Sequence, residues 1–216
     1  MRKFKKIVDK REKIGYNEIR CVINVFLSRG EVMRVITGSA RGRKLFAPEG
    51  LDVRPTTDKV KEAVFSAVQF DLEDALVLDL FAGSGQMGIE ALSRGAARCV
   101  FIDNSQRAIR AINENLRATG FERQSEVVSR DSYDYIKHTS KTFDIIILDP
   151  PYRYNHIANI LPFAAKKVSD KGIIICEYEK EADIPPTPDG MIMKKTYKYG
   201  KISVTIFRKP LEEDEE

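Results

Sequence analysis

The chain has 216 residues, of which 43% are hydrophobic and 31% are charged, and its formal net charge is +4. That length suits one compact domain, and the composition excludes a collagen-like fibre or a globally disordered chain. It also excludes a membrane-spanning bundle, because the longest apolar runs, such as 145–148, are far shorter than the roughly 20 residues that cross a bilayer. We therefore expect a soluble protein.

The cysteines and histidines form no pattern of a metal site or a disulfide framework. Cys21, Cys99 and Cys176 are odd in number and widely separated, which is typical of a protein in a reducing cytoplasm. Two histidines cannot build a His-rich site, and we expect no metal cofactor. The apolar stretch 22–27 is too short for the core of a signal peptide, which also favours a cytoplasmic location.

Charge is unevenly distributed along the chain. Residues 1–32 hold nine basic and four acidic residues, while 212–216 are all acidic. We interpret 211–216 as a frayed, solvated tail, with a functional acidic tail as the alternative. Residues 33–61 hold seven basic residues against three acids, whereas 62–210 hold twenty of each sign. Apart from the two ends, the basic excess therefore lies at the start of the chain's main part.

The predicted elements begin with a basic β-hairpin and a helix, which precede the first strand of a sheet. Thr56 and Thr57 can cap that helix. From residue 76 onward, apolar runs alternate with segments of helical periodicity. The predicted strands are 76–81, 99–103, 125–129, 143–149 and 172–178, and the predicted helices are 87–94, 105–119, 131–138 and 155–168.

Alternation of this kind, with largely apolar strands, predicts a parallel sheet that helices cover on both faces. A proline-rich connection follows, and two alternating strands around 194–197 and 202–207 predict a closing antiparallel hairpin. The expected fold is α/β, a doubly wound and mostly parallel seven-stranded sheet. We expect one domain, residues 33–210, to contain it.

A glycine-rich loop follows the first predicted strand. Gly83, Gly85 and Gly88 match the GxGxxG pattern, whose glycines permit a tight turn and the close approach of a ligand. The pattern alone indicates a dinucleotide or another adenosyl cofactor. The residues of this region that we expect to bind the cofactor are Asp79, Phe81, Ala82, Gly83, Ser84 and Gly85.

Acidic residues lie at the ends of the first three predicted strands. Asp103 can accept hydrogen bonds from ribose hydroxyls, and Asp131 can either touch an adenine edge or cap the next helix. Asp79 lies four residues before the first glycine, where a nicotinamide-binding strand usually carries an apolar residue. An acid there suits the ammonium group of S-adenosylmethionine, so the sequence favours this methyl donor over a dinucleotide.

The fourth predicted strand runs into Asp149, Pro150, Pro151 and Tyr152. Two prolines can simply form a rigid turn at the end of a strand. They can also preorganise two acceptors, the Asp149 carboxylate and the Pro150 carbonyl, for the N–H groups of an exocyclic amine on a nucleobase. Tyr152 offers a flat face on which the base can stack. We therefore expect amine methylation by positioning, without a nucleophilic side chain.

These motifs resemble those of the class I, S-adenosylmethionine-dependent methyltransferases, whose amino-methyltransferase motif DPPY matches 149–152. Further segments resemble, in the same order, the RsmD family, which methylates the N2 amine of one guanine in bacterial small-subunit ribosomal RNA. The resemblance covers about residues 33–209. It is carried by 33–38 (MRVITG), 42–45 (GRKL), 54–58 (RPTTD), 79–85 (DLFAGSG), 90–96 (EALSRGA) and Tyr199-Gly200.

The resemblance implies a Rossmann-like methyltransferase fold with S-adenosylmethionine as cofactor. It implies that Asp79 and the loop glycines line the donor's amino-acid end. Asp103 would bind the ribose, Asp131 the adenine, and 149–152 the target guanine. The partner would be small-subunit ribosomal RNA, within an assembled or assembling subunit, and we expect a monomer. Residues 1–32 have no counterpart in the family, and we favour a misassigned start codon over an unrelated basic arm.

Two basic segments are expected to flank the DPPY turn and contact RNA phosphates. One is 33–61, and the other is 191–209, where six basic residues are interleaved with tyrosines and no acid occurs. A scattered, solvated surface is the alternative. The residues that we expect to bind RNA are Arg34, Arg41, Arg43, Lys44, Arg54, Thr56 and Lys198.

Other functions remain open at this point. The same acceptors suit adenine N6 in DNA and a glutamine side chain in a protein. A sequence-specific DNA enzyme would normally need additional mass for target recognition, for which this chain leaves little room. A non-catalytic RNA-binding module and a dehydrogenase are further alternatives, and binding of a nicotinamide cofactor would distinguish the second.

Overall fold

The computed structural model describes residues 33–47, 58–150, 156–180 and 185–210. All of these belong to one compact unit, Met33–Glu216. The predictions that lie outside the described residues concern 1–32, 211–216, Arg54, Thr56, Thr57, Pro151 and Tyr152.

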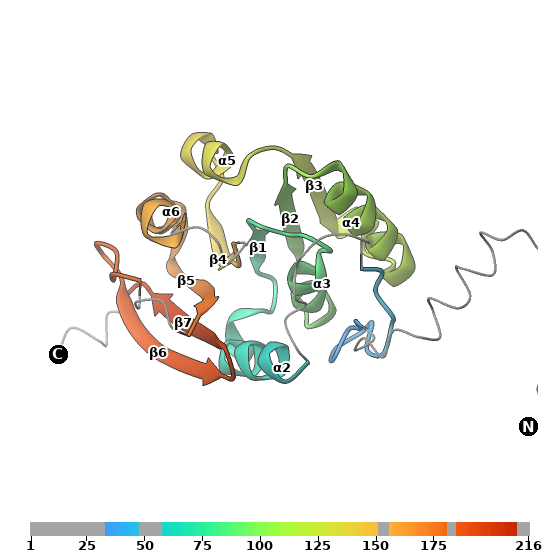
Figure 1. Ribbon diagram of the computed structural model, residues 1–216, viewed down its shortest axis with the longest axis horizontal. Helices are drawn as coiled ribbons and strands as arrows, with labels where there is room; N and C mark the ends of the chain where they lie inside the picture. The colour runs from blue at the N-terminus through green and yellow to red at the C-terminus, as the bar shows by residue number, and fades with distance from the viewer. Residues whose placement is uncertain (1–32, 48–57, 151–155, 181–184, 211–216) are drawn as a thin grey trace, which may run out of the picture. The chain divides into compact units, whose positions relative to one another are not determined.

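A seven-stranded sheet with the order β3-β2-β1-β4-β5-β7-β6 forms the centre of this unit (Figure 1). The first five strands of that order pair in parallel, and β7 pairs antiparallel with both β5 and β6. The strands are β1 (Leu76–Asp79), β2 (Arg98–Asp103), β3 (Ser125–Ser129), β4 (Phe143–Leu148), β5 (Val168–Glu179), β6 (Ile192–Tyr199) and β7 (Ile202–Arg208). The predicted fold class, including the closing hairpin, is confirmed.

Helices cover both faces of the sheet (Figure 1). One face carries α2 (Asp58–Ala67), α3 (Gln86–Ser93) and α4 (Gln106–Thr119), and the other carries α5 (Ser132–His138) and α6 (His156–Ala165). The ends of α4 follow from its sequence. The Ser105 hydroxyl caps the first turn by accepting from the Ala108 N–H, and Gly120 ends the helix at a φ of +82°.

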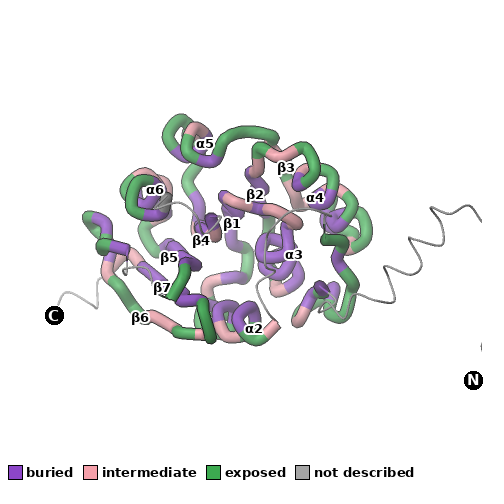
Figure 2. The backbone as a smooth tube through the Cα atoms, viewed as in Figure 1, coloured by how far each residue is buried: buried purple, intermediate pink, exposed green. Residues whose placement is uncertain are grey.

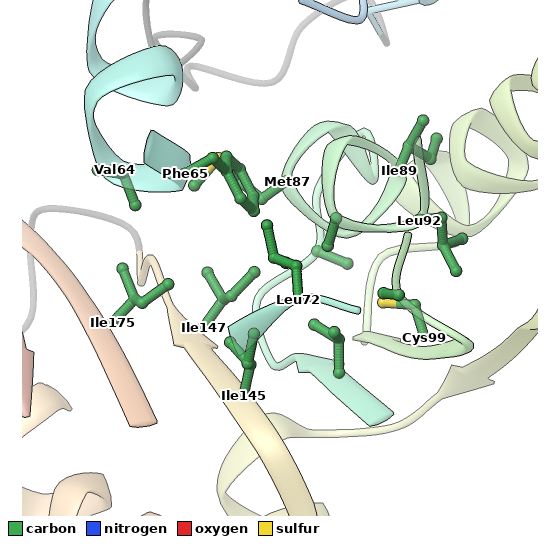
Figure 3. Packing of buried hydrophobic residues seen from close by; sticks show 14 of the residues in the cluster. Val64, Phe65, Leu72, Met87, Ile89, Leu92, Cys99, Ile145, Ile147 and Ile175 are labelled. Carbon is green, nitrogen blue, oxygen red and sulfur yellow. The ribbon is translucent and has the colours of Figure 1, made fainter. Parts of the chain in front are cut away.

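Side-chain alternation along the strands produces a core on each face of the sheet. Figure 3 shows Phe65 of α2 and Met87 of α3 packed over Ile147 and Ile175, while the neighbouring Ile146 belongs to the opposite core. The central strands are therefore buried on both sides (Figure 2), as their continuous apolar runs predict.

One predicted boundary is wrong. The helix predicted at 155–168 ends at Ala165, and β5 begins at Val168, four residues before the predicted strand. Val168 pairs with Phe143 of β4 and is 3% exposed, so its side chain belongs to the sheet. Gly172 does not start the strand. It lies where a Cβ would come within 2.9 Å of a carbonyl oxygen of β4, so only glycine fits between the strands.

The strand order also fixes where a ligand can bind. β1 lies between β2 and β4. The strand order reverses at β1, because the chain continues from β1 to β2 and β3 on one side and β4 and β5 lie on the other. In open α/β sheets, ligands bind at such a switch point. The glycine loop follows β1 there, and Asp149 and Pro150 follow β4.

Candidate active site

The loop after β1 turns on two glycines with left-handed backbone. Gly83 has a φ of +55°, and Gly85, the N-cap of α3, has a φ of +79°. The Ala82 N–H donates to the carbonyl oxygen of Ile102 at 2.9 Å, which holds the loop against the end of β2. A Cβ on Gly83 would meet no atom of the described chain within 4 Å. The loop therefore needs glycine for its backbone and leaves space beside it for a ligand.

Gly88 fits for a different reason. A Cβ there would lie 2.3 Å from a ring carbon of Phe101 and 2.6 Å from Sγ of Cys99, so α3 packs on β2 at a distance that only glycine allows. Its N–H donates to the Asp79 carboxylate at 2.9 Å. Asp79 is 2% exposed, and burial raises its pKa to about 7 against the lowering effect of that hydrogen bond. Its predicted contact with an ammonium group stays a prediction.

Asp103 joins β2 to the glycine loop. One carboxylate oxygen accepts from the Gly83 N–H at 2.9 Å, and the other accepts from the Ser105 N–H at 2.8 Å. The side chain is half-buried, and burial raises its pKa although these backbone donors lower it. Each oxygen keeps further acceptor capacity for a ribose hydroxyl.

Asp131 is the N-cap of α5. Its carboxylate accepts from the Asp134 N–H at 2.9 Å, and the residue is exposed. Of the two roles that the sequence left open, the cap is the one observed. The adenine contact stays a prediction.

Acidic residues from three strands lie on one face of the sheet at its carboxyl edge. Strand alternation puts Asp103 and Glu177 on the face that α2, α3 and α4 cover, and continuing the register of β4 by one residue beyond Leu148 brings Asp149 to the same face and level. Asp149 is half-buried, and Pro150 after it is buried. Glu177 is 3% exposed, and the sequence analysis missed it. Continuing the alternation of β5 to its end is the signal that could have found it.

Gln86 is a second residue that the sequence analysis missed. It is the first residue of α3 and is 8% exposed. Its side-chain carbonyl oxygen is buried and has no hydrogen-bond partner within the described parts of the chain. An acceptor in this state, directly after the glycine loop, suits a ligand that brings an N–H or O–H donor.

The N-terminal part of the unit, 33–46, forms a small antiparallel hairpin. Arg34 and Lys44 form its bridge, and Val35 and Leu45 are buried. Because neighbouring side chains alternate between the two sides, Arg34 and Lys44 lie on the exposed side. The predicted basic hairpin is therefore present, although it is short.

Glu90 of α3 holds this hairpin in place. Its carboxylate is fully buried, accepts the N–H groups of Ile36 (2.7 Å) and Thr37 (3.0 Å), and pairs with Nε of Arg94 at 2.7 Å. Ser93 adds side-chain and backbone hydrogen bonds to the same turn. The two sequence segments MRVITG and EALSRGA are therefore in direct contact.

The cations predicted to bind RNA are exposed where the structure describes them. Arg41, Arg43 and Lys44 form no ion pair with another described residue, while Arg34 pairs with Asp58 at 3.0 Å. Lys198 is exposed on β6, whose turn into β7 lies at the carboxyl edge, beside the end of β5.

Two basic residues of the predicted RNA-binding segments do not face solvent. Lys61 is 1% exposed, and its Nζ donates to the Arg34 carbonyl oxygen at 2.8 Å; burial lowers its pKa. Arg208 donates from Nη2 to both carboxylate oxygens of Asp71, each at 2.7 Å. Neither residue is among those predicted to bind RNA, and both make contacts within the protein.

The sheet order, the glycine loop at the switch point and the acidic edge define a Rossmann-like methyltransferase fold. The Escherichia coli protein yhhF shares it, with a TM-score of 0.75, 29% identity, and 83% of this chain and 98% of that chain covered. A family model described as "Conserved hypothetical protein 95" matches residues 33–208. The chain therefore belongs to this family of methyltransferases, the RsmD family.

Relatives agree over nearly their full length. YlbH of Bacillus subtilis (strain 168) is 37% identical over 182 residues, which cover 82% of this chain and 99% of that protein. "Ribosomal RNA small subunit methyltransferase D" of Escherichia coli (strain K12) is 30% identical over 179 residues, with 82% and 90% covered. The resemblance inferred from the motifs is confirmed.

Two further findings apply to the described residues only. None of their helices is long and apolar enough to span a bilayer. No group of three or more His, Cys, Asp or Glu among them could hold a metal ion.

Proposed function

We propose that this protein transfers a methyl group from S-adenosylmethionine to the N2 amine of a guanine in small-subunit ribosomal RNA. The observation that carries the proposal is the place of Asp149. It directly follows β4, next to the strand that leads into the glycine loop, and continuing the register of β4 by one residue brings it to the level and face of Asp103. The Escherichia coli relative's name, a small-subunit ribosomal RNA methyltransferase, supports the choice of substrate class.

Several features of the loop fit the methyl donor. The carboxylate of the methyl donor suits the start of α3, because helix N-termini attract anions and this one has no side-chain cap. Its ammonium group suits the buried acceptor of Gln86 and the carboxyl of Asp79. Its ribose suits Asp103, which the Gly83 and Ser105 amides already orient. When bound, the donor supplies an electrophilic methyl group on a sulfonium.

The protein's own contribution is to position and polarise the amine. The lone pair of a guanine N2 is delocalised into the ring, so the amine is a weak nucleophile. In our proposal the Asp149 carboxylate accepts one N–H and the Pro150 carbonyl the other, which holds the nitrogen in line with the methyl group. The donor would supply the methyl group, whose carbon would exchange its bond to sulfur for a bond to nitrogen. Asp149 would stabilise the positive charge that nitrogen gains and accept the proton that nitrogen then loses.

The RNA has to present this guanine unstacked, because the amine is inaccessible within a stacked helix. The exposed cations of the hairpin support binding of such a strand, since Arg41, Arg43 and Lys44 have no acidic partner in the described chain. The phosphates of an RNA strand would provide these cations with anionic partners.

The test of this mechanism is the variant Asp149→Asn, with Asp170→Asn as a matched control at an exposed site of β5. We expect D149N to lower the rate of methyl transfer to small ribosomal subunits about 10²- to 10³-fold, as loss of an electrostatic transition-state contact does. Donor affinity, measured by calorimetry, should change little, and D170N should behave as wild type. Transfer by D149N at the wild-type rate would refute the proposed role.

A further inference from the structure

Phe46 is an apolar residue in an unusual place. It follows the basic hairpin directly, and its side chain is 48% exposed although phenylalanine is usually buried. The hairpin's own apolar residues, Val35 and Leu45, are buried in the core cluster, to which Phe46 does not belong. A ring presented to solvent by a basic element is suited to stacking on a nucleic-acid base.

The backbone of Phe46 is held by a buried side chain. The Asn115 amide of α4, 1% exposed, accepts the Phe46 N–H at 2.6 Å and donates to the Phe46 carbonyl oxygen at 3.0 Å. The same Nδ2 donates to the carbonyl oxygen of Ser84 at 2.8 Å. One amide group therefore joins Phe46 to the glycine loop. The Ser84 hydroxyl also donates to Sδ of Met33 at 3.4 Å, which ties the other end of the hairpin to the loop.

The hairpin strand that carries this ring also carries exposed cations, although Arg34 on the facing strand pairs with Asp58 at 3.0 Å. Lys44 lies two residues before Phe46, so alternation puts both side chains on the exposed side of the strand, across from Arg34. Arg43 is exposed and has no ion pair with a described residue. An aromatic face with cations around it is how proteins bind single-stranded nucleic acid, because bases stack on the ring and phosphates contact the cations.

We propose that the Phe46 ring stacks on an unpaired RNA base that flanks the target guanine. The inference rests on the proposed function and adds a base-stacking site on the side of the glycine loop where Asn115 holds the hairpin. RNA is the occupant that fits, because the exposed residues around the ring are cationic and the backbone that carries the ring is fixed beside the site where a nucleotide must be held. Asn115 acts as a positioning residue, since it contacts only the backbone of Phe46 and of the loop.

The chain contains no tryptophan, which allows a direct test. Phe46→Trp places a single indole at the proposed site. Phe70→Trp places one at a second exposed phenylalanine of the described residues (93% exposed), which precedes β1 at the opposite edge of the sheet. The fluorescence of each variant is titrated with a short single-stranded RNA and, separately, with S-adenosylhomocysteine. We expect the RNA to quench the indole of F46W strongly and that of F70W little, because only a stacked base quenches efficiently.

Kinetics provide a second measurement. Phe46→Ala should raise the KM for RNA between about fivefold and a hundredfold, the range that loss of one stacked base predicts, with kcat and donor affinity unchanged. Phe46→Tyr should restore KM, and Phe70→Ala should leave it unchanged.

Two results would overturn the inference. One is unchanged fluorescence of F46W with RNA although this variant still methylates it, and the other is quenching of F46W by S-adenosylhomocysteine but not by RNA. Failure of the proposed function looks different, because the wild-type protein would then methylate no RNA, whatever the fluorescence of F46W.

Discussion

The carboxyl group of Asp79 illustrates what a single buried group contributes. It lies where β1 meets the glycine loop, is 2% exposed, and accepts the Gly88 N–H. Burial disfavours the carboxylate and raises the pKa to about 7, well above the value of about 3.9 for an unfolded aspartate. Between these two values the folded protein keeps a proton that the unfolded chain has lost.

A dependence of stability on pH follows. From about pH 4 to about pH 7 the free energy of unfolding should fall as pH rises, by on the order of a few kcal/mol, and it should level off above pH 7. Asp79→Asn cannot titrate and should remove this decline. Urea denaturation of both proteins between pH 4 and pH 8, without donor, measures the difference. Parallel curves for the two proteins would show that the Asp79 pKa is not raised.

Sequence and structure agree at the residues whose role depends on their local surroundings. Gly83 and Gly85 were predictable because a strand-to-helix turn needs a left-handed backbone, and Asp103 because it ends the second strand. Glu90 and Asn115 were not, since each acts on a segment more than fifty residues away along the chain. Only the folded chain brings such pairs together.

At the scale of elements, the hairpin and α3 are joined by hydrogen bonds along their length, from the glycine loop at Ser84 to the end of α3 at Ser93. Gly38 is the point of closest approach. Its φ is +88°, and a Cβ there would lie 1.7 Å from the carbonyl oxygen of Ser93. Gly42, in the same hairpin, has a similar φ of +81°, but a Cβ there would meet no described atom within 4 Å.

These two glycines form a matched pair. Gly42→Ala should cost only the left-handed backbone penalty of about 1–2 kcal/mol. Gly38→Ala should cost at least about 2 kcal/mol more, because the hairpin must move off α3 to make room. Chemical denaturation of both variants provides the comparison. Equal losses would mean that the hairpin does not depend on this contact.

Element types were predictable from periodicity, but the start of β5 was not. Val168 is a single apolar residue among polar ones, three residues after Ala165, so its spacing continues the helical pattern equally well. Only its pairing with Phe143 makes it part of the strand. Periodicity leaves this ambiguity, which tertiary contacts resolve. The role of Asp131 was ambiguous for a similar reason, since a helix cap and a ligand contact use the same carboxylate.

At the scale of the whole molecule, the net charge is +4, and the basic residues differ in whether they are paired within the protein. The hairpin presents Arg41, Arg43 and Lys44 without acidic partners among the described residues, whereas Lys61 and Arg208 serve the structure internally. Fewer basic residues are therefore available to bind RNA than the number in the sequence indicates.

Charge reversal tests this location. Arg41→Glu with Arg43→Glu should weaken RNA binding at least about tenfold and reduce its salt dependence, because two phosphate contacts are lost. Donor affinity should not change. Lys166→Glu with Lys171→Glu is the control, since both lysines are exposed near the amino end of β5 and lie outside the hairpin. Equal weakening by both pairs would contradict a localised RNA surface.

The most direct test of the central claim identifies the product. The protein is incubated with radiolabelled S-adenosylmethionine and, in parallel, unmethylated small ribosomal subunits, naked ribosomal RNA, DNA and protein. Each substrate is then digested and separated into nucleosides or amino acids. We predict that the label co-elutes with N2-methylguanosine from the ribosomal RNA. Label in methylated adenine or glutamine, or no transfer to any guanine, would contradict the account.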